Sequence, residues 1–286
     1  MIWEYLREEE FEEAIRISKS VCAMPVGCLE MHGQHLPVGT DILKASYILK
    51  KAAEIEPVCV FPDYKFGNIP GHTTHKGGVR LSPELEMQLM KELCAEIARN
   101  GFKKILLVNS HGGNKAFLTY FIRSTQYEKK DYVVLSYNIK LTTPYMLLDL
   151  IGKYGREYLF ELTDEDIEIL RDFVEKKKEC GHACFGETAL MLGSYLELVR
   201  MDRIYALDGL STNKIKHLDE VGLTESTRFW GVNYPNAYHG HPPEGCNKRI
   251  GDCCIRIASE QLARVLRVMK EDDQMLKWND EWNNKW

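Results

Sequence analysis

The chain has 286 residues, 44% of them hydrophobic, which is enough for a sizeable core in one or two domains. A formal net charge of −5 argues against nucleic acid as the main partner. The sequence has no apolar run of about eighteen residues or more, so we expect no transmembrane helix and no membrane partner.

The N-terminus and the cysteines together predict a cytoplasmic location. Residues 1–10 are acidic and amphipathic, whereas a signal peptide has a basic region followed by an apolar one. The nine cysteines are scattered and include no C-x-x-C pair. This pattern suits a reducing compartment and disfavours a structural zinc ribbon.

The first half of the chain alternates apolar runs with helical patterns. We predict strands at 20–27, 58–64, 104–108 and 132–137, and helices at 41–55, 83–100 and 114–127. Ser82 supplies an N-cap for the second helix, and Pro83 occupies its first position. The alternation predicts a three-layer α/β/α fold with a mostly parallel sheet.

The second half is more helical. Residues 142–180 form a charged helical excursion, in which Thr163 and Asp166 have the spacing of a capping box. This excursion could be a lid or a subunit contact, and the sequence leaves both open. A last core helix is expected at 255–269, and we treat residues 1–286 as one domain.

The tail at 274–286 has tryptophans at helical spacing. Trp278, Trp282 and Trp286 would form one stripe on a helix. Packing on its own domain is one interpretation of this stripe. We favour the other, in which it contributes to oligomer contacts, because an aromatic stripe on a terminal extension is a typical interface anchor.

The strongest functional signal follows the first strand. Glu30, His32, His35 and Asp41 lie within one short polar loop that leads into a helix. Residues two apart in an extended segment project to the same side, so Glu30 and His32 can reach one point. Carboxylate and imidazole groups in this setting fit a Zn²⁺ or Mn²⁺ site, although such a loop can also be merely solvated.

Two more polar clusters follow at the starts of helical runs. The segment 109–114 reads N-S-H-G-G-N and contains His111, and the segment 181–188 contains His182 and Glu187. Open α/β sheets bind ligands beyond the carboxyl ends of their strands, where such loops converge. Three clusters of this kind favour a functional site.

These segments resemble the creatininase (creatinine amidohydrolase) family. The matching motifs are G-x-x-E-x-H-G-x-H-L-P from Gly27 to Pro37 with Asp41, the N-x-H-G-G-N segment, and G-H-A-x-x-x-E-T from Gly181 to Thr188. The resemblance implies a creatininase-like α/β/α fold and a hydrolase of carbon–nitrogen bonds with two divalent ions, Zn or Mn, with Fe as a third option. It also implies a homo-oligomer, with a hexamer as one form.

The resemblance further implies a role for each site residue. Glu30 and His111 would hold one ion, His32 the other, and Asp41 would bridge both. Creatininases carry a glutamate two residues after the histidine matched by His111, where this chain has Gly113. We therefore assign Glu187 as the fifth ligand.

The implied chemistry is amide hydrolysis. Two close cations lower the pKa of a shared water, so that metal-bound hydroxide attacks a carbonyl. Backbone N–H groups at Gly112 and Gly113 or a metal would stabilise the oxyanion, and His182 would protonate the leaving amine. His182 could instead be a capping or buried histidine. His35 could orient a ligand or belong to the loop's hydrogen-bond network, and we prefer the network.

The substrate stays open. The loops at 71–80, with His72 and His75, and at 234–243, with His239 and His241, depart from the family and would shape a substrate pocket. The tryptophans that enclose creatinine have no clear counterparts. We expect a small cyclic amide or formamide; the alternatives are an oxidised inositol, a peptide, or a non-catalytic metal-binding role.

Overall fold

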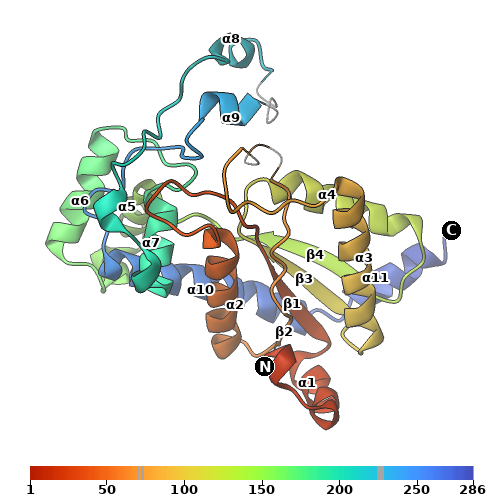
Figure 1. Ribbon diagram of the computed structural model, residues 1–286. Coiled ribbons are helices and arrows are strands. Elements are labelled where there is room, and N and C mark those ends of the chain that lie inside the picture. The colour runs from red at the N-terminus through yellow and green to blue at the C-terminus, as the bar shows by residue number, and fades with distance from the viewer. Residues whose placement is uncertain (70, 72–73, 224–228, 286) are drawn as a thin grey trace.

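A four-stranded parallel sheet forms the centre of the computed structural model, which describes residues 1–69, 71, 74–223 and 229–285 (Figure 1). The strand order is β2 (Cys59–Val60), β1 (Val21–Val26), β3 (Lys104–Asn109), β4 (Val133–Asn138). The strand expected at 58–64 is shorter than predicted. Pro62 has no N–H group for a strand ladder, and beyond it only Tyr64 bridges to β1.

Helices cover both faces of the sheet. One face bears α2 (Thr40–Ile55), α7 (Phe185–Ser194) and α10 (Lys248–Glu271); the other bears α1 (Phe11–Ser18), α3 (Pro83–Arg99) and α4 (Asn114–Ser124). Successive strand residues alternate between the two cores: Val21 and Leu106 face α2 and α10, whereas Cys22 and Ile105 face α3 and α4. The predicted three-layer α/β/α fold is therefore confirmed.

Local capping signals account for several helix starts. Ser82 Oγ accepts a hydrogen bond from Leu85 N at 3.3 Å, and Thr163 and Asp166 form the predicted capping box of α6 (Asp164–Glu175). The helix expected at 255–269 is longer, because Asn247 caps α10 through Ile250 N. The helix expected at 114–127 ends earlier, at Ser124, and a 3-10 turn follows it.

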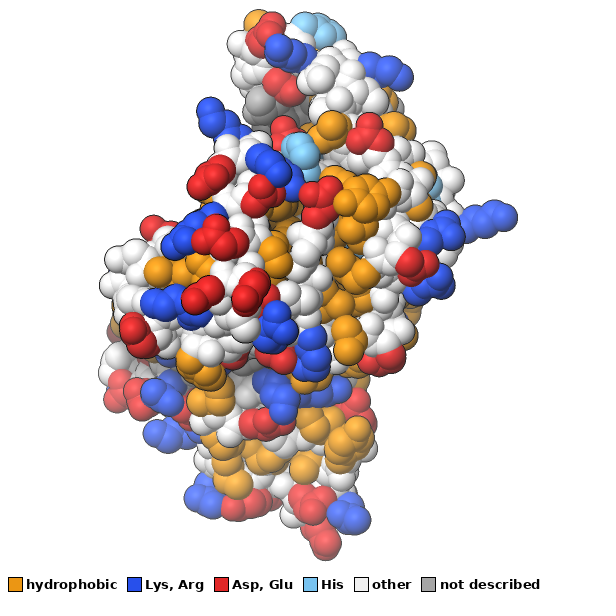
Figure 2. Space-filling view, turned by 90° about the vertical axis from the view of Figure 1, so that its left-hand side faces the viewer, with side chains coloured by type: hydrophobic (Ala, Val, Ile, Leu, Met, Phe, Trp, Pro, Cys, Tyr) orange, Lys and Arg blue, Asp and Glu red, His pale blue; other side chains and the backbone are white. Residues whose placement is uncertain are grey.

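The excursion at 142–180 extends the core. It holds α5 (Pro144–Tyr154) and α6, whose Leu147, Leu170 and Phe173 are buried in the same cluster as α7 and α10. Figure 2 looks at this side of the molecule and shows acidic and basic side chains interspersed on it.

Three short helices complete the chain. α8 (Lys216–Asp219) and α9 (Trp230–Asn233) lie beyond one end of the sheet in Figure 1, and α11 (Met275–Asn283) packs beside β4. Trp278 and Trp282 on α11 are 57% and 43% exposed, and Trp286 lies outside the described residues. Within the described part of the chain, every helix is too short or too polar to cross a membrane.

Candidate metal centre

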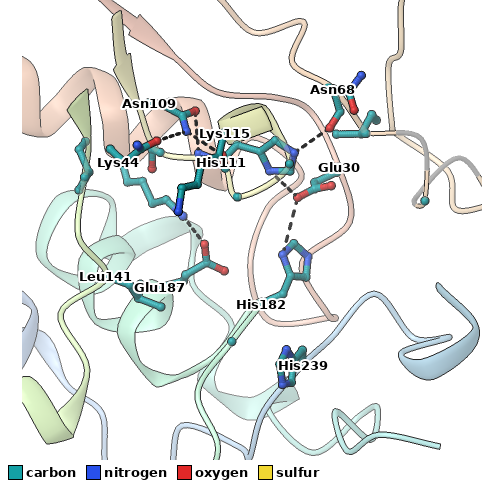
Figure 3. A pocket seen from close by; sticks show the side chains of 18 of the residues that line it. Glu30, Lys44, Asn68, Asn109, His111, Lys115, Leu141, His182, Glu187 and His239 are labelled. Carbon is teal, nitrogen blue, oxygen red and sulfur yellow. Dashed lines mark hydrogen bonds and ion pairs between the residues drawn. The ribbon is translucent and has the colours of Figure 1, made fainter. Parts of the chain in front are cut away.

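The six residues singled out as ligands or acid–base group come together: four of them line one cavity, and His32 and Asp41 contact these from behind. The loop after β1 supplies Glu30 and His32, the first turn of α2 supplies Asp41, and the turn between β3 and α4 supplies His111. His182 comes from the loop just before α7, and Glu187 comes from the first turn of that helix. The cavity has a volume of about 610 Å³, and Figure 3 shows Glu30, His111, His182 and Glu187 on its wall.

A first group of donor atoms forms around His111. His111 Nδ1 lies 3.1 Å from Glu30 Oε1 and 3.0 Å from Asp41 Oδ2. The thiol of Cys28 lies 3.1 Å from the same Asp41 oxygen. All four residues are buried, and one donor atom of each lies within 4.8 Å of the others.

A second group forms around His32. His32 Nε2 lies 3.6 Å from Asp41 Oδ1 and 3.6 Å from Glu187 Oε2, while its Nδ1 contacts the carbonyl oxygen of Glu30 at 3.1 Å. The Nε2 atom is fully buried and forms no hydrogen bond with any described residue. A buried imidazole nitrogen that faces two carboxylates fits a cation between them. Asp41 belongs to both groups, with a different oxygen in each.

A lysine also contacts the two carboxylates of the second group. Lys44 lies one turn after Asp41 on α2, and its Nζ is 2.7 Å from Asp41 Oδ1. The same ammonium group donates a hydrogen bond to Glu187 Oε1, as Figure 3 shows. The Lys44 side chain is 3% exposed, so this cation is fixed inside the site.

The charges in this cluster shift each other's pKa values. Burial alone would lower the pKa of His32, but the carboxylates of Asp41 and Glu187 outweigh it and raise the pKa to about 9. Burial would raise the pKa values of Asp41 and Glu187, yet Lys44 and His32 hold both below their usual range. Both carboxylates are therefore ionised at neutral pH, as metal ligands must be.

Close packing explains why a glycine occupies position 113. A side-chain carbon at Gly113 would lie 2.5 Å from His111 Nε2 and 2.6 Å from the carbonyl oxygen of Asn68. These two atoms lie 2.9 Å apart in a hydrogen bond that orients the His111 ring. The position occupied by a glutamate in creatininases therefore has no room for one here. Gly112 and Gly113 both line the cavity, as their expected contact with substrate requires.

His182 lies beside His32 and Glu30. Its Nε2 contacts the carbonyl oxygen of Met31 at 2.8 Å, and its Nδ1 lies 3.6 Å from Glu30 Oε1. The ring packs on His32 with centroids 4.1 Å apart, and the Trp230 ring lies nearly perpendicular to it with centroids 5.5 Å apart. His182, Glu30 and His32 also have donor atoms within 4.8 Å of one another.

Some of the remaining histidines form hydrogen bonds that support the fold, and one lines the cavity. His35 is buried, and its Nε2 contacts Thr188 Oγ1 at 3.1 Å, which places it in the network that joins the loop to α7. His239 lines the cavity and stacks on Tyr234. His241 Nδ1 instead accepts a hydrogen bond from Glu179 N. Of the loop at 71–80, His75 lies outside the described cavity wall, and His72 lies outside the described residues.

Three residues of the site were missed at the level of sequence. Cys28 stands two residues before Glu30, so the same alternation that paired Glu30 with His32 could have included it. Lys44 stands at i+3 from Asp41, which puts both on one helix face. Trp230 has no comparable local signal, because the tertiary fold brings α9 to the cavity.

Comparison with known proteins identifies the family. The model of the family described as "Creatininase: Creatinine amidohydrolase" matches residues 4–266. The chain belongs to the creatininase family. It is 28% identical over 214 residues to the creatinine amidohydrolase of Pseudomonas putida, a match that covers 68% of this chain and 72% of the relative.

Other creatininase-family relatives match shorter segments. A 2-amino-5-formylamino-6-ribosylaminopyrimidin-4(3H)-one 5'-monophosphate deformylase of Methanococcus voltae is 32% identical over 92 residues, or 30% of this chain and 32% of the relative. The mycofactocin precursor peptide peptidase of Mycolicibacterium smegmatis is 30% identical over 118 residues, a match that covers 38% of this chain and 46% of the relative. The family and these hydrolase relatives identify the chain as a metal-dependent hydrolase.

Solved structures agree with the fold. A manganese form of creatininase has a TM-score of 0.69 at 19% identity and covers 95% of this chain and 99% of its own. A zinc–zinc form of a creatininase variant has the same TM-score and identity, with coverage of 95% and 98%.

Proposed function

We propose that this protein is a dinuclear-metal-dependent amidohydrolase that cleaves a carbon–nitrogen bond of a small cyclic amide or formamide. One observation carries the proposal: two groups of donor atoms share Asp41 beside a cavity that also contains His182. The creatinine amidohydrolase and deformylase relatives act on bonds of this class, as their names state. Nine free thiols support the cytoplasm as its location.

The two groups of donor atoms support a ligand assignment. Glu30, His111 and Asp41 would hold the first ion, with Cys28 as a fourth donor, and His32, Asp41 and Glu187 would hold the second. The mixture of imidazole and carboxylate suits Zn²⁺, Mn²⁺ or Fe²⁺. Zinc–zinc and manganese forms of creatininase support the first two. When bound, such ions polarise a carbonyl group and activate a water.

We propose His182 as the residue that transfers a proton. Its Nε2 faces the Met31 carbonyl oxygen, which only accepts hydrogen bonds, so Nε2 carries a proton and Nδ1 is the atom that exchanges one. Nδ1 faces Glu30 at the cavity wall. We assign to it the protonation of the leaving amine. Backbone N–H groups at Gly112 and Gly113 would face the developing oxyanion.

The cavity suits a small, partly planar molecule. Ile139, Leu141, Leu190 and Trp230 give it apolar surface, and Asn138 and Lys115 add polar groups. A volume of about 610 Å³ falls in the range of small-molecule sites. The indole of Trp230, nearly perpendicular to the His182 ring, would cover a planar substrate next to the proton donor.

A metal-dependent hydrolysis screen tests the function. The protein would be stripped with chelator, reloaded with Mn²⁺ or Zn²⁺, and incubated with panels of cyclic amides, N-formyl compounds and short peptides, with products followed by mass spectrometry. We expect hydrolysis in the first two panels that chelator abolishes and that an Asp41→Ala variant lacks. Two bound ions without turnover in any panel would refute the proposed enzymatic activity and identify a metal-binding protein instead.

A further inference from the structure

The ammonium group of Lys44 lies where the second metal ion would find its ligands. Asp41 Oδ1, which is 3.6 Å from His32 Nε2, is also the oxygen that contacts Lys44 Nζ at 2.7 Å. Glu187 gives one oxygen to Lys44 and turns the other toward His32. Lysine and ion would therefore share the same two carboxylates.

The other oxygen of Asp41 points toward the first donor group. Asp41 Oδ2 faces His111 and Cys28, on the opposite side of the carboxylate from the lysine contact. That group also has four donor residues, whereas the second has three. The two positions thus differ in the number of donor residues, and the second also shares its carboxylates with a buried ammonium.

Charge balance points the same way. In the second donor group, Asp41 and Glu187 bring two negative charges, and Lys44 offsets one of them. Asp41 also faces the first donor group, so its charge serves both positions. A second divalent ion therefore enters beside a buried ammonium that already offsets part of the charge of its carboxylates.

We propose that Lys44 competes with the second metal ion, so that the protein binds its two ions with unequal affinity. The inference rests on the dinuclear centre proposed above and goes beyond it by naming the residue that sets the order of loading. The first position fills tightly. The second fills only when its ion displaces Lys44 from Asp41 and Glu187, and at low metal concentration the lysine holds these carboxylates in place.

Metal titration of lysine variants tests this. Chelator-treated wild type, Lys44→Met and Lys44→Arg would be titrated with Mn²⁺ by calorimetry, with elemental analysis after desalting. In wild type we expect one tight ion and one at least about tenfold weaker. Lys44→Met keeps the side-chain length without the charge and should tighten the second ion by at least about tenfold, whereas Lys44→Arg should behave like wild type.

Two further variants keep the test decisive. Lys44→Gln, whose amide can still donate hydrogen bonds to the carboxylates, replaces Lys44→Met if the latter does not fold without metal. His32→Ala in the uncharged background should remove the tightened ion and so locate it. If the second ion binds the uncharged variants no more tightly than wild type, Lys44 supports the ligands and the inference is wrong. Unequal affinities without any hydrolysis would instead refute only the proposed function.

Discussion

Asp41 Oδ2 and His111 Nδ1 lie 3.0 Å apart, although Asp41 begins α2 and His111 precedes α4 on the opposite face of the sheet. Both side chains reach this point from the carboxyl ends of the neighbouring strands β1 and β3. The contact explains how one carboxylate can serve two ions, because its other oxygen faces His32.

Replacing Asp41 should therefore abolish the centre. We expect Asp41→Ala to lose both ions and all hydrolysis, since each donor group loses the ligand they share. Elemental analysis after desalting measures the ions. Asp164→Ala, which removes a carboxylate with a 99% exposed side chain, is the control and should keep both. Two tightly bound ions in Asp41→Ala would show that Asp41 does not bridge.

His182→Ala separates proton transfer from ligation. If His182 protonates the leaving group, the variant should keep its ions and lose about 10²–10⁴-fold in kcat. Because His182 also lies near Glu30 and His32, loss of an ion would identify it as a ligand instead. His217→Ala, on the exposed face of α8, is the control. Normal turnover in His182→Ala would exclude both roles.

Cys28 should influence which metal is bound. A thiolate is a soft ligand that favours zinc over manganese, so Cys28→Ser should shift the preference toward Mn²⁺ in a competition measured by elemental analysis. Protein loaded with Co²⁺ should show a sulfur-to-metal absorption band in the near ultraviolet that Cys28→Ser lacks. Cys180→Ser, outside both donor groups, should retain the band. A wild-type spectrum without the band would remove Cys28 from the ligand set.

His35 should make the protein sensitive to acid. Burial lowers its pKa from 6.5 to about 4, so below pH 6.5 the unfolded chain binds a proton that the folded protein does not. The free energy of unfolding is then highest above about pH 6.5 and falls toward pH 4, by up to about 3 kcal/mol from this group. In urea titrations, His35→Gln should flatten this slope, and the exposed His217→Gln should not. An unchanged slope in His35→Gln would contradict the pKa shift.

Much of this site could be predicted because its residues are local to strand ends. The apolar runs of β1 and β3 are unambiguous, and parallel strands bring the residues that follow them to one edge. Position alone therefore predicts that the polar clusters with Glu30, His32, Asp41 and His111 meet at this edge. The cluster with His182 and Glu187 is likewise visible as a polar segment before a helix, although more than sixty residues separate it from β3. The proposed role of each residue comes from the family resemblance.

Contacts between segments that are distant in the sequence could not be predicted in this way. In the sequence, Lys44 looks like any lysine on an amphipathic helix. Its role depends on the contact with Glu187 of α7, which only the folded chain provides. The shortening of β2 depends on Pro62, whose effect on pairing competes with the apolar run around it. The excursion at 142–180 is charged on one side, yet its buried side reaches the core, and the described cavity wall includes none of its residues.

The tail should contribute to assembly. Trp278 and Trp282 are exposed on α11, while Asn279 and Asn283 bind the Lys130 carbonyl oxygen and so dock the helix on its own subunit. On the docked helix both indoles present exposed surface, and we expect a second copy of the chain to pack there. Truncation after Asp273 should lower the assembly state in light scattering and leave a folded subunit.

A double variant sharpens this prediction. Trp278→Ser with Trp282→Ser removes the indoles but keeps both asparagine contacts, so it should lower the assembly state without freeing α11. Circular dichroism checks that the helix content is unchanged, and Tyr5→Ser, which alters another exposed aromatic residue, is the control. If both the truncation and the double variant keep the wild-type mass, the tryptophans do not hold the oligomer together.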